Sequence, residues 1–137
     1  MLHVLTKIGS TTVYGAFDTL KEARADTRAM LDAMPRLKVA ERCELNDLYR
    51  MARILPEAGI TTRPLRSVHH TISFAGMFGN NTSIGEIALC HLGAMLMSEP
   101  LAFSLGIREH LPRVLHEGYT RGIVARPAAV VMHAERP

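Results

Sequence analysis

The sequence predicts an α/β domain in three layers, with a mainly parallel sheet between helices and a small β-hairpin insertion. Two observations predict it. Short apolar runs rich in β-branched residues alternate along the chain with stretches whose apolar residues recur at helical spacing. The length of 137 residues suits a single domain with a hydrophobic core, and the chain shows no internal repeat or linker. Strands that alternate with helices are typical of a parallel sheet covered on both faces.

The first half of the chain predicts one strand and two helices. Residues 2–8 are short, apolar and partly β-branched, and Gly-Ser stops them. A helix begins near Thr19, because a glutamate three residues later completes the pattern of a capping box, and a proline closes it. Residues 39–55 predict a second helix, and we expect Cys43 on its buried stripe.

The second half predicts further strands around one more helix. Residues 63–71 and 87–97 are strand candidates, separated by a loop rich in Gly and Asn. Pro100 suits the first turn of a helix, and Pro112 should kink or split it because proline removes one backbone hydrogen bond. Two last strand candidates, which would pair as a hairpin, are residues 119–124 and 129–133.

Composition excludes some classes of function. Hydrophobic residues make up 47% and charged residues 21%, as in ordinary globular proteins. No apolar run approaches the roughly 20 residues that span a bilayer, and the N-terminus lacks the pattern of a secretory signal. We therefore expect a cytoplasmic protein without a membrane partner. The net charge of +3 permits weak DNA contact, although no dense basic cluster marks a nucleic-acid footprint.

The stretch over residues 63–99 carries the most informative motifs. RPLRSVHHTIS occupies residues 63–73, GEIALCHLG residues 85–93, and AMLMSE residues 94–99. This order resembles the magnesium-chelatase-like ATPases of the AAA+ class, in which segments close to RPFRSPHHTIS, GEISLAHNG and VLFLDE follow one another. The likeness covers most of the chain, and it implies a single, partial AAA+-like domain over residues 1–137 with a P-loop-NTPase-like fold.

The resemblance implies ATP and magnesium as cofactors. Residues 3–9 are similar to the strand that leads into the family's phosphate loop. A working loop needs the pattern G-x-x-x-x-G-K-[ST], in which backbone amides and the lysine hold the phosphates. Residues 9–16 read GSTTVYGA, so the lysine and hydroxyl positions are changed, and Lys21 could substitute only in a rebuilt loop. The candidate nucleotide-binding residues are Gly9, Ser10, Thr11, Thr12, Gly15 and Lys21.

The acidic end of the family's next strand is changed as well. The family has Asp-Glu there, which orients magnesium and polarises the attacking water, and this chain has Ser98 and Glu99. Ser98 is the candidate metal ligand, acting through a water, and Glu99 is the candidate catalytic residue. A structural role is open for Glu99, which can face the N-terminus of the helix at Pro100. These changes predict weak or absent hydrolysis.

Paired polar residues elsewhere predict structural roles. His69 and His70 would point to opposite faces of a strand, one buried and hydrogen-bonded and the other at the surface. Cys90 and His91 meet the same objection to a shared metal, and no zinc-binding spacing surrounds them. Glu86 is also expected to be structural.

Two functions remain open from the sequence. The first is an ATP-binding domain of this family with weak or absent hydrolysis, inside a homo-oligomer or a larger AAA+ assembly. The alternative is a catalytically inactive protein- or DNA-interaction module that retains the AAA+ fold. The sequence alone does not distinguish this module from a decayed remnant without selected function. Whether the chain is an enzyme stays undecided, because the next core strand and the helical lid are expected beyond Pro137.

Overall fold

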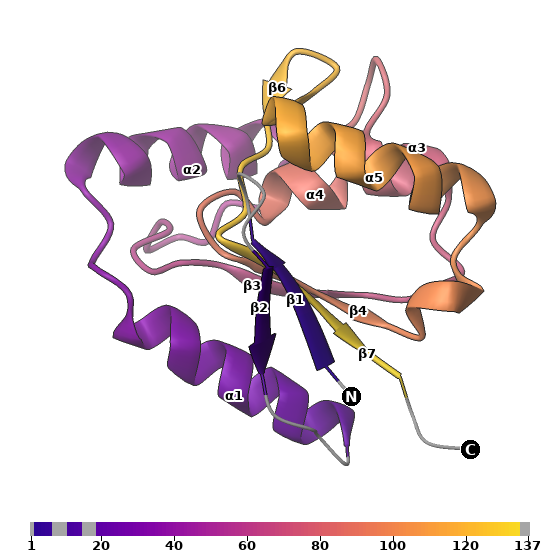
Figure 1. Cartoon of the computed structure of the whole chain (residues 1–137). Coiled ribbons are helices and arrows are strands. Elements are labelled where there is room, and N and C mark those ends of the chain that lie inside the picture. Colours follow the sequence, from indigo (N-terminus) through magenta and orange to yellow (C-terminus); the bar gives the residue numbers. More distant parts are fainter. Residues whose placement is uncertain (1, 7–10, 15–18, 135–137) are drawn as a thin grey trace.

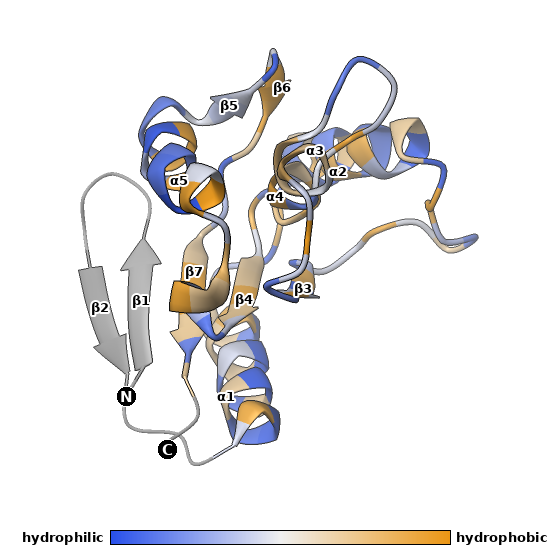
Figure 2. Cartoon of the chain, turned by 90° about the vertical axis from the view of Figure 1, so that its right-hand side faces the viewer, coloured by the Kyte–Doolittle hydropathy of each residue, from blue (hydrophilic) through white to orange (hydrophobic). Residues whose placement is uncertain are grey.

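One five-stranded sheet separates two layers of helices (Figure 1). The structure is a computed structural model that describes residues 2–6 and 11–14 as backbone and residues 19–134 with their side chains. The helices are α1 (Leu20–Ala33), α2 (Val39–Met51), α3 (Phe74–Phe78), α4 (Glu86–Leu89), the 3-10 helix η1 (Pro100–Ala102) and α5 (Leu105–Glu117). Helix α1 covers one face of the sheet, and α2 to α5 lie over the other (Figure 2). The expected α/β class and its three layers are confirmed.

The sheet has a parallel part and an antiparallel part. Its strands are β1 (Leu2–Thr6), β2 (Thr11–Tyr14), β3 (Leu65–Val68), β4 (Ala94–Ser98) and β7 (Ala129–His133), in the order β2-β1-β7-β4-β3. Strands β3, β4 and β7 are parallel, whereas β1 runs antiparallel to both of its neighbours. The expected small hairpin insertion is present as β5 (Tyr119–Thr120) and β6 (Ile123–Val124).

The central strand β4 divides the hydrophobic core into two clusters. Met95 and Met97 face the large cluster under α2 to α5, while Ala94 and Leu96 face a smaller one that includes Leu31 of α1. All four strand residues are buried, with at most 1% of their surface exposed. A strand covered on both faces has no polar side, which explains the continuous apolar run in the sequence.

The two predicted N-terminal helices are confirmed. The Thr19 hydroxyl accepts a hydrogen bond of 3.1 Å from the backbone N–H of Glu22, so the predicted cap starts α1. Helix α2 begins where the sequence predicts and ends at Met51. The expectation for Cys43 is wrong, because this residue is exposed. It lies two positions before Leu45, roughly 200° around the helix from the buried face. That face carries Leu45, Leu48 and Tyr49.

The predicted strand over residues 87–97 is half wrong, since its first part is helix α4 and only the second part is β4. Both parts are buried, and periodicity cannot separate a buried helix from a buried strand in one apolar run. The change of structure occurs at Leu92, with a φ of 63°, and at Gly93. A Cβ on Gly93 would lie 1.9 Å from the carbonyl oxygen of Pro64, so only glycine allows β4 to begin beside β3.

Two further expectations for the second half are corrected. Residues 119–124 do not pair with residues 129–133, because β7 joins the main sheet parallel to β4. The next core strand after β4 is therefore β7, and it does not lie beyond Pro137. Pro112 does not split α5, which is continuous from Leu105. Proline is exposed there, so water can satisfy the carbonyl that loses its partner. The helix predicted to begin at Pro100 is interrupted instead between η1 and α5.

Candidate functional site at the carboxyl edge

The candidate site lies where the three parallel strands end. We call this the carboxyl edge, and it follows Val68, Ser98 and His133 of β3, β4 and β7. The opposite edge, where these strands begin, is called the amino edge. In open α/β sheets, ligands bind outside the carboxyl ends of parallel strands. Ser98 and His133 are paired in register, which places the ends of β4 and β7 side by side.

Glu99 is held at this edge in a strained backbone conformation. Its φ of 55° and ψ of 65° lie in the left-handed region, which costs a residue with a side chain about 1 kcal/mol or more. The backbone N–H donates to the carbonyl oxygen of His133 at 2.8 Å, and the carbonyl oxygen accepts from Ala102 at 2.9 Å. Two hydrogen bonds therefore fix the residue that the sequence singles out as the candidate catalytic carboxylate.

Glu99 also occupies the N-cap of the helix that begins at Pro100, as expected, although that helix is short. The residue precedes η1, which has only three residues, and its side chain forms no cap hydrogen bond there. The long helix α5 has its own cap, because the Ser104 hydroxyl accepts from the N–H of Ile107 at 3.4 Å. Glu99 thus stands at the start of the helix at Pro100, as expected, but this helix is a 3-10 turn of three residues, and the structural role of the carboxylate stays a prediction.

His133 is a site residue that the sequence reasoning missed. Its side chain is 1% exposed, and neither ring nitrogen has a hydrogen-bond partner among the residues that the structure describes. A buried polar group without a partner is costly, which is why such groups often mark functional positions. The available signal was a polar residue that ends the apolar run AVVMH.

Lys21 lies toward the same edge because of the direction of α1. Further along this helix, a guanidinium nitrogen of Arg24 donates to the hydroxyl of Ser67 in β3. One turn later, Arg28 Nη1 donates to the carbonyl oxygen of Arg63, just before β3 begins, at 2.9 Å. Helix α1 therefore runs opposite to β3, and its exposed first turn lies toward the carboxyl edge.

The other candidate nucleotide-binding residues are not brought to this edge as a loop. Thr11 and Thr12 belong to β2, where they pair with Leu5 and Val4 of β1. A P-loop connects a strand to a helix, whereas these two residues lie within a strand, and their nucleotide-binding role stays a prediction. Thr6, at the end of β1, is opposite Ala129 at the amino edge. The remaining candidates, Gly9, Ser10 and Gly15, lie outside the described residues.

Behind the carboxyl edge, an ion pair joins β3 to α4. Arg66 Nε and Nη2 donate to the two carboxylate oxygens of Glu86 at 2.6 and 3.1 Å, which agrees with the expected structural role of Glu86. The hydrogen bond to Glu86 raises the pKa of Arg66.

Two buried groups beside this ion pair also have shifted pKa values. Burial raises the pKa of the Tyr49 hydroxyl, which donates to the carbonyl oxygen of Leu89 at 2.7 Å. Burial, and then the nearby Glu86 charge, raises the pKa of the Cys90 thiol far above its usual range.

The paired histidines are arranged differently from expectation. Strand β3 ends at Val68, so His69 and His70 are not held on opposite faces, and their ring centroids lie 4.1 Å apart. His69 is exposed and its Nδ1 lies 2.8 Å from the hydroxyl of Thr71. His70 is half-buried. The buried, hydrogen-bonded histidine is instead His91, whose ring connects two distant parts of the amino edge.

The donor set at the carboxyl edge does not fit magnesium-bound ATP. Magnesium prefers carboxylate and phosphate oxygens, and the strand end offers Ser98 in place of a second acid. Within the described ranges, no three residues among His, Cys, Asp and Glu are placed to hold a metal ion. Among the residues that the structure describes, the strand ends thus bring together Glu99 and the buried His133, and Lys21 lies toward the same edge.

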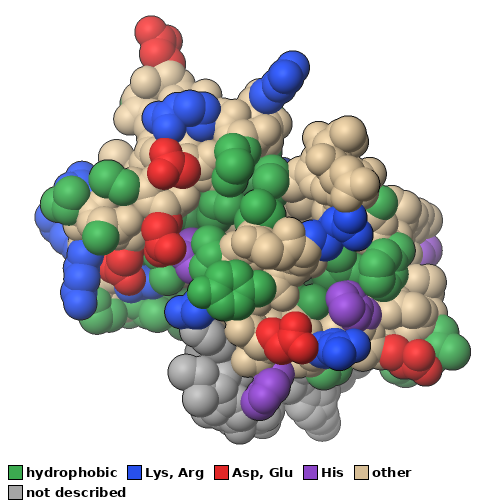
Figure 3. Space-filling view, turned by 90° about the horizontal axis from the view of Figure 1, so that it is seen from above, with side chains coloured by type: hydrophobic (Ala, Val, Ile, Leu, Met, Phe, Trp, Pro, Cys, Tyr) green, Lys and Arg blue, Asp and Glu red, His purple; other side chains and the backbone are tan. Residues whose placement is uncertain are grey.

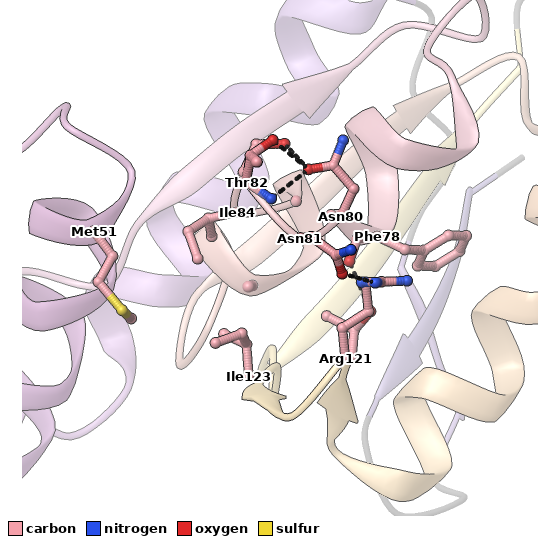
Figure 4. A pocket seen from close by; sticks show the side chains of 13 residues that line it. Met51, Phe78, Asn80, Asn81, Thr82, Ile84, Arg121 and Ile123 are labelled. Atoms are coloured by element: carbon pink, nitrogen blue, oxygen red, sulfur yellow. Dashed lines mark hydrogen bonds between the residues drawn. The ribbon is translucent and has the colours of Figure 1, made fainter.

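A hollow of about 610 Å³ lies away from the strand ends, between the 79–85 loop and the β5–β6 hairpin (Figure 4). The Asn80 amide oxygen organises the loop, since it accepts from the Thr82 N–H at 2.9 Å and the Ser83 hydroxyl at 2.8 Å. Arg121 of the hairpin donates to the amide oxygen of Asn81, which links the two segments. Loop and hairpin therefore form one connected surface.

Comparison with known proteins identifies the family. The sequence model described as "Magnesium chelatase, subunit ChlI" matches residues 22–134, which is most of the chain. This match takes in β3, α4, β4 and the Ser98-Glu99 pair, and it begins one residue after Lys21. A search of curated proteins finds no match. In the described parts of the chain, no helix is long and apolar enough to cross a membrane. The chain therefore belongs to the magnesium chelatase subunit ChlI family.

Proposed function

We propose that this chain is an AAA+-type domain whose ATP hydrolysis is weak or absent and which acts as an interaction module in a larger assembly. One observation carries the proposal: β4 ends in Ser98 followed by Glu99, so a single acid stands at the end of this described strand. Phosphoryl transfer is catalysed chiefly by charges that hold magnesium and neutralise the transferring group. A serine hydroxyl brings no such charge.

The position of β2 supports the same proposal. A phosphate loop holds its ligand with several backbone amides at the start of a helix. Thr11 and Thr12 instead use their backbone in a strand, next to β1. Two separate means of holding a triphosphate, the loop and the strand-end acid pair, are thus altered at once.

Exposed apolar side chains favour an interaction role. Phe74, Leu101 and Leu105 are 48%, 82% and 58% exposed, and all three belong to elements that follow β3 or β4. Figure 3 shows hydrophobic side chains at the surface between charged groups, on the face that carries α3 and α5. Large apolar residues that reach solvent close to one another are typical of protein-binding surfaces.

A phosphate-release assay tests the catalytic part of the proposal. Wild-type protein should release phosphate from magnesium-ATP at the same rate as Glu99→Gln. A second variant, Glu109→Gln on the exposed side of α5, serves as a matched control for the charge change. A wild-type rate well above that of Glu99→Gln, but equal to that of Glu109→Gln, would show that Glu99 supports turnover and would overturn the proposal.

Sedimentation tests the interaction part. If the protein assembles through the apolar residues, the double variant Leu101→Ser and Leu105→Ser should sediment as a smaller species than the wild type. Both side chains are mostly exposed, so their replacement should leave the fold intact. If the double variant sediments as the same species as the wild type, the protein does not assemble through Leu101 and Leu105.

Weak nucleotide binding without turnover is the second candidate function. Lys21 favours it, because its position in the first turn of α1 lies toward the same edge as Glu99. A lysine charge beside a helix N-terminus attracts phosphate even where magnesium is poorly held. Loss of ATP binding in Lys21→Gln, with the fold retained, would support this candidate.

A further inference from the structure

A second concave surface, at the opposite edge of the sheet, is strongly basic. A hollow of about 510 Å³ lies between the end of α1, the segment that leads to α2, and residues 61–63. Arg63 stands immediately before β3, and its Nη1 donates at 2.8 Å to the carbonyl oxygen of Leu92, just before β4. The hollow therefore belongs to the amino edge, away from Ser98 and Glu99.

The charges that line this hollow are unbalanced. Four arginines and one aspartate contribute to the wall: Arg28, Arg36, Arg42, Arg63 and Asp32. Arg28 is paired with Asp32 through a contact of 3.0 Å. Among the described residues, the three other arginines form no ion pair. Three positive charges thus surround one concavity without a neutralising carboxylate.

Arg63 is a fixed charge in the wall. Its Nε and Nη2 donate to the carbonyl oxygen of Pro35 at 3.2 and 2.8 Å, in addition to the bond with Leu92. Carbonyl oxygens orient a guanidinium group but do not cancel its charge. Glu41 and Glu44 line a neighbouring hollow on the other side of Arg63. Glu41 accepts from the Lys38 N–H, and Glu44 contacts the ring of His91.

Arg36 and Arg42 are different, because their side chains are exposed and form no hydrogen bond with a described residue. They can therefore turn toward a ligand without breaking an existing contact. The exposed residues Thr61 and Thr62 add hydroxyl groups to the same wall. The apolar part of the wall comes from Leu31, Met34 and Leu37.

We propose that this hollow binds a small phosphorylated molecule through Arg36, Arg42 and Arg63. The planar guanidinium fork matches two phosphate oxygens at once, which an isolated charge does not. The volume lies in the range of small-molecule sites. This site is independent of the proposed function, since it lies at the amino edge and uses none of the residues that would take part in ATP hydrolysis.

Amide NMR with pyrophosphate as the probe tests the proposal on the whole chain. We expect saturable shifts centred on residues 36–42 and 61–63, and none at Ser98 or Glu99. The double variant Arg36→Gln and Arg42→Gln should weaken binding roughly tenfold or more, because each charge-assisted hydrogen bond is worth about that factor. Arg113→Gln on α5, where Arg113 pairs with Glu117, is the matched control and should bind as wild type.

Three outcomes would overturn the proposal. The first is no saturable shift at millimolar pyrophosphate. The second is an equal loss of affinity in the Arg113→Gln control, which would indicate nonspecific attraction to a basic protein. The third is binding of a duplex oligonucleotide at these residues without any binding of pyrophosphate, which would assign the surface to a nucleic-acid backbone. Retained spectra in the double variant show that its fold is intact.

Discussion

The two edges of the parallel sheet are built in different ways. At the amino edge, close packing and hydrogen bonds join segments that are distant in sequence: Gly93 packs on Pro64, Arg63 donates to the carbonyl oxygens of Pro35 and Leu92, and His91 accepts from the Arg126 N–H. At the carboxyl edge, Glu99 is strained and His133 is buried without a described partner. The amino edge is therefore held by packing and hydrogen bonds, whereas the carboxyl edge holds a strained backbone at Glu99 and a buried histidine whose ring nitrogens have no partner among the described residues.

The largest effect should come from the packed edge, at Gly93. In Gly93→Ala the new Cβ would meet the Pro64 carbonyl oxygen at 1.9 Å, and neither backbone can yield without separating β3 from β4. We expect a loss of about 3 kcal/mol or more in the free energy of unfolding, measured with urea. Gly106→Ala is the control, since the nearest atom to its Cβ is a Phe74 ring carbon at 3.8 Å. A loss below 1 kcal/mol in Gly93→Ala would contradict the packing described here.

The next effect concerns ion pairs of different burial. Arg66 and Glu86 are 32% and 26% exposed, so removing one partner leaves a charge that water reaches poorly. Glu86→Gln should cost about 2 kcal/mol. The matched change Glu117→Gln breaks the surface pair with Arg113 and should cost less than about 0.5 kcal/mol. Equal costs for the two variants in urea unfolding would show that burial does not set the strength of these pairs.

Much of the fold could be predicted from the sequence, and the errors have physical causes. The TLKE pattern correctly gave the cap at Thr19, because capping depends on local chemistry alone. The run 87–97 was misread because burial removes periodicity from both α4 and β4. The partner of β7 was misread because strand pairing depends on contacts distant in sequence, and the sequence signal gave only a strand.

The candidate site could be predicted only in part. Ser98 and Glu99 were found because they end a recognisable strand. The separation of Thr11 and Thr12 from that edge depends on β1 being antiparallel, a property that no local pattern reveals. His133 was missed because an isolated histidine at a strand end gives a weak signal, and its burial becomes apparent only when β7 lies beside β4.

A smaller effect should appear at the start of α1. Thr19→Ala removes the hydroxyl that accepts from the Glu22 N–H at 3.1 Å, and the cap is worth about 1 kcal/mol. Thermal unfolding should show the loss, and Thr19→Ser should restore it because serine keeps the acceptor. Equal stability of the alanine and serine variants would mean that the cap does not anchor this helix.

The two cysteines give a kinetic comparison. Exposed Cys43 should react with a thiol reagent at neutral pH, whereas Cys90 should react only as fast as the protein unfolds. Burial raises the Cys90 pKa, so the folded protein holds the thiol proton where the unfolded chain releases it. Stability should therefore fall as the pH rises above the ordinary thiol pKa. Cys90→Ala should reduce this alkaline loss, and an unchanged pH profile would contradict the assignment.

The smallest effect tests the strain at the carboxyl edge. Glu99→Gly removes the penalty for a left-handed residue with a side chain, and glycine entropy offsets part of the gain. Glu99→Ala is the matched reference, because it removes the same side-chain contacts and keeps the penalty, and we expect Glu99→Gly to be more stable than Glu99→Ala by about 0.5 kcal/mol. Equal stability of the two variants in urea unfolding would mean that the backbone at position 99 is not strained, which would weaken the contrast between the edges.

The central proposal is that ATP hydrolysis at the carboxyl edge is weak or absent. The most direct measurement is titration of the whole chain with magnesium-ATP, followed residue by residue through amide NMR shifts and paired with phosphate release. We expect no saturable magnesium-dependent shift at Ser98 or Glu99 and no release above the Glu99→Gln rate. Saturable shifts at Lys21, Ser98 and Glu99 together with turnover that Glu99→Gln abolishes would contradict it.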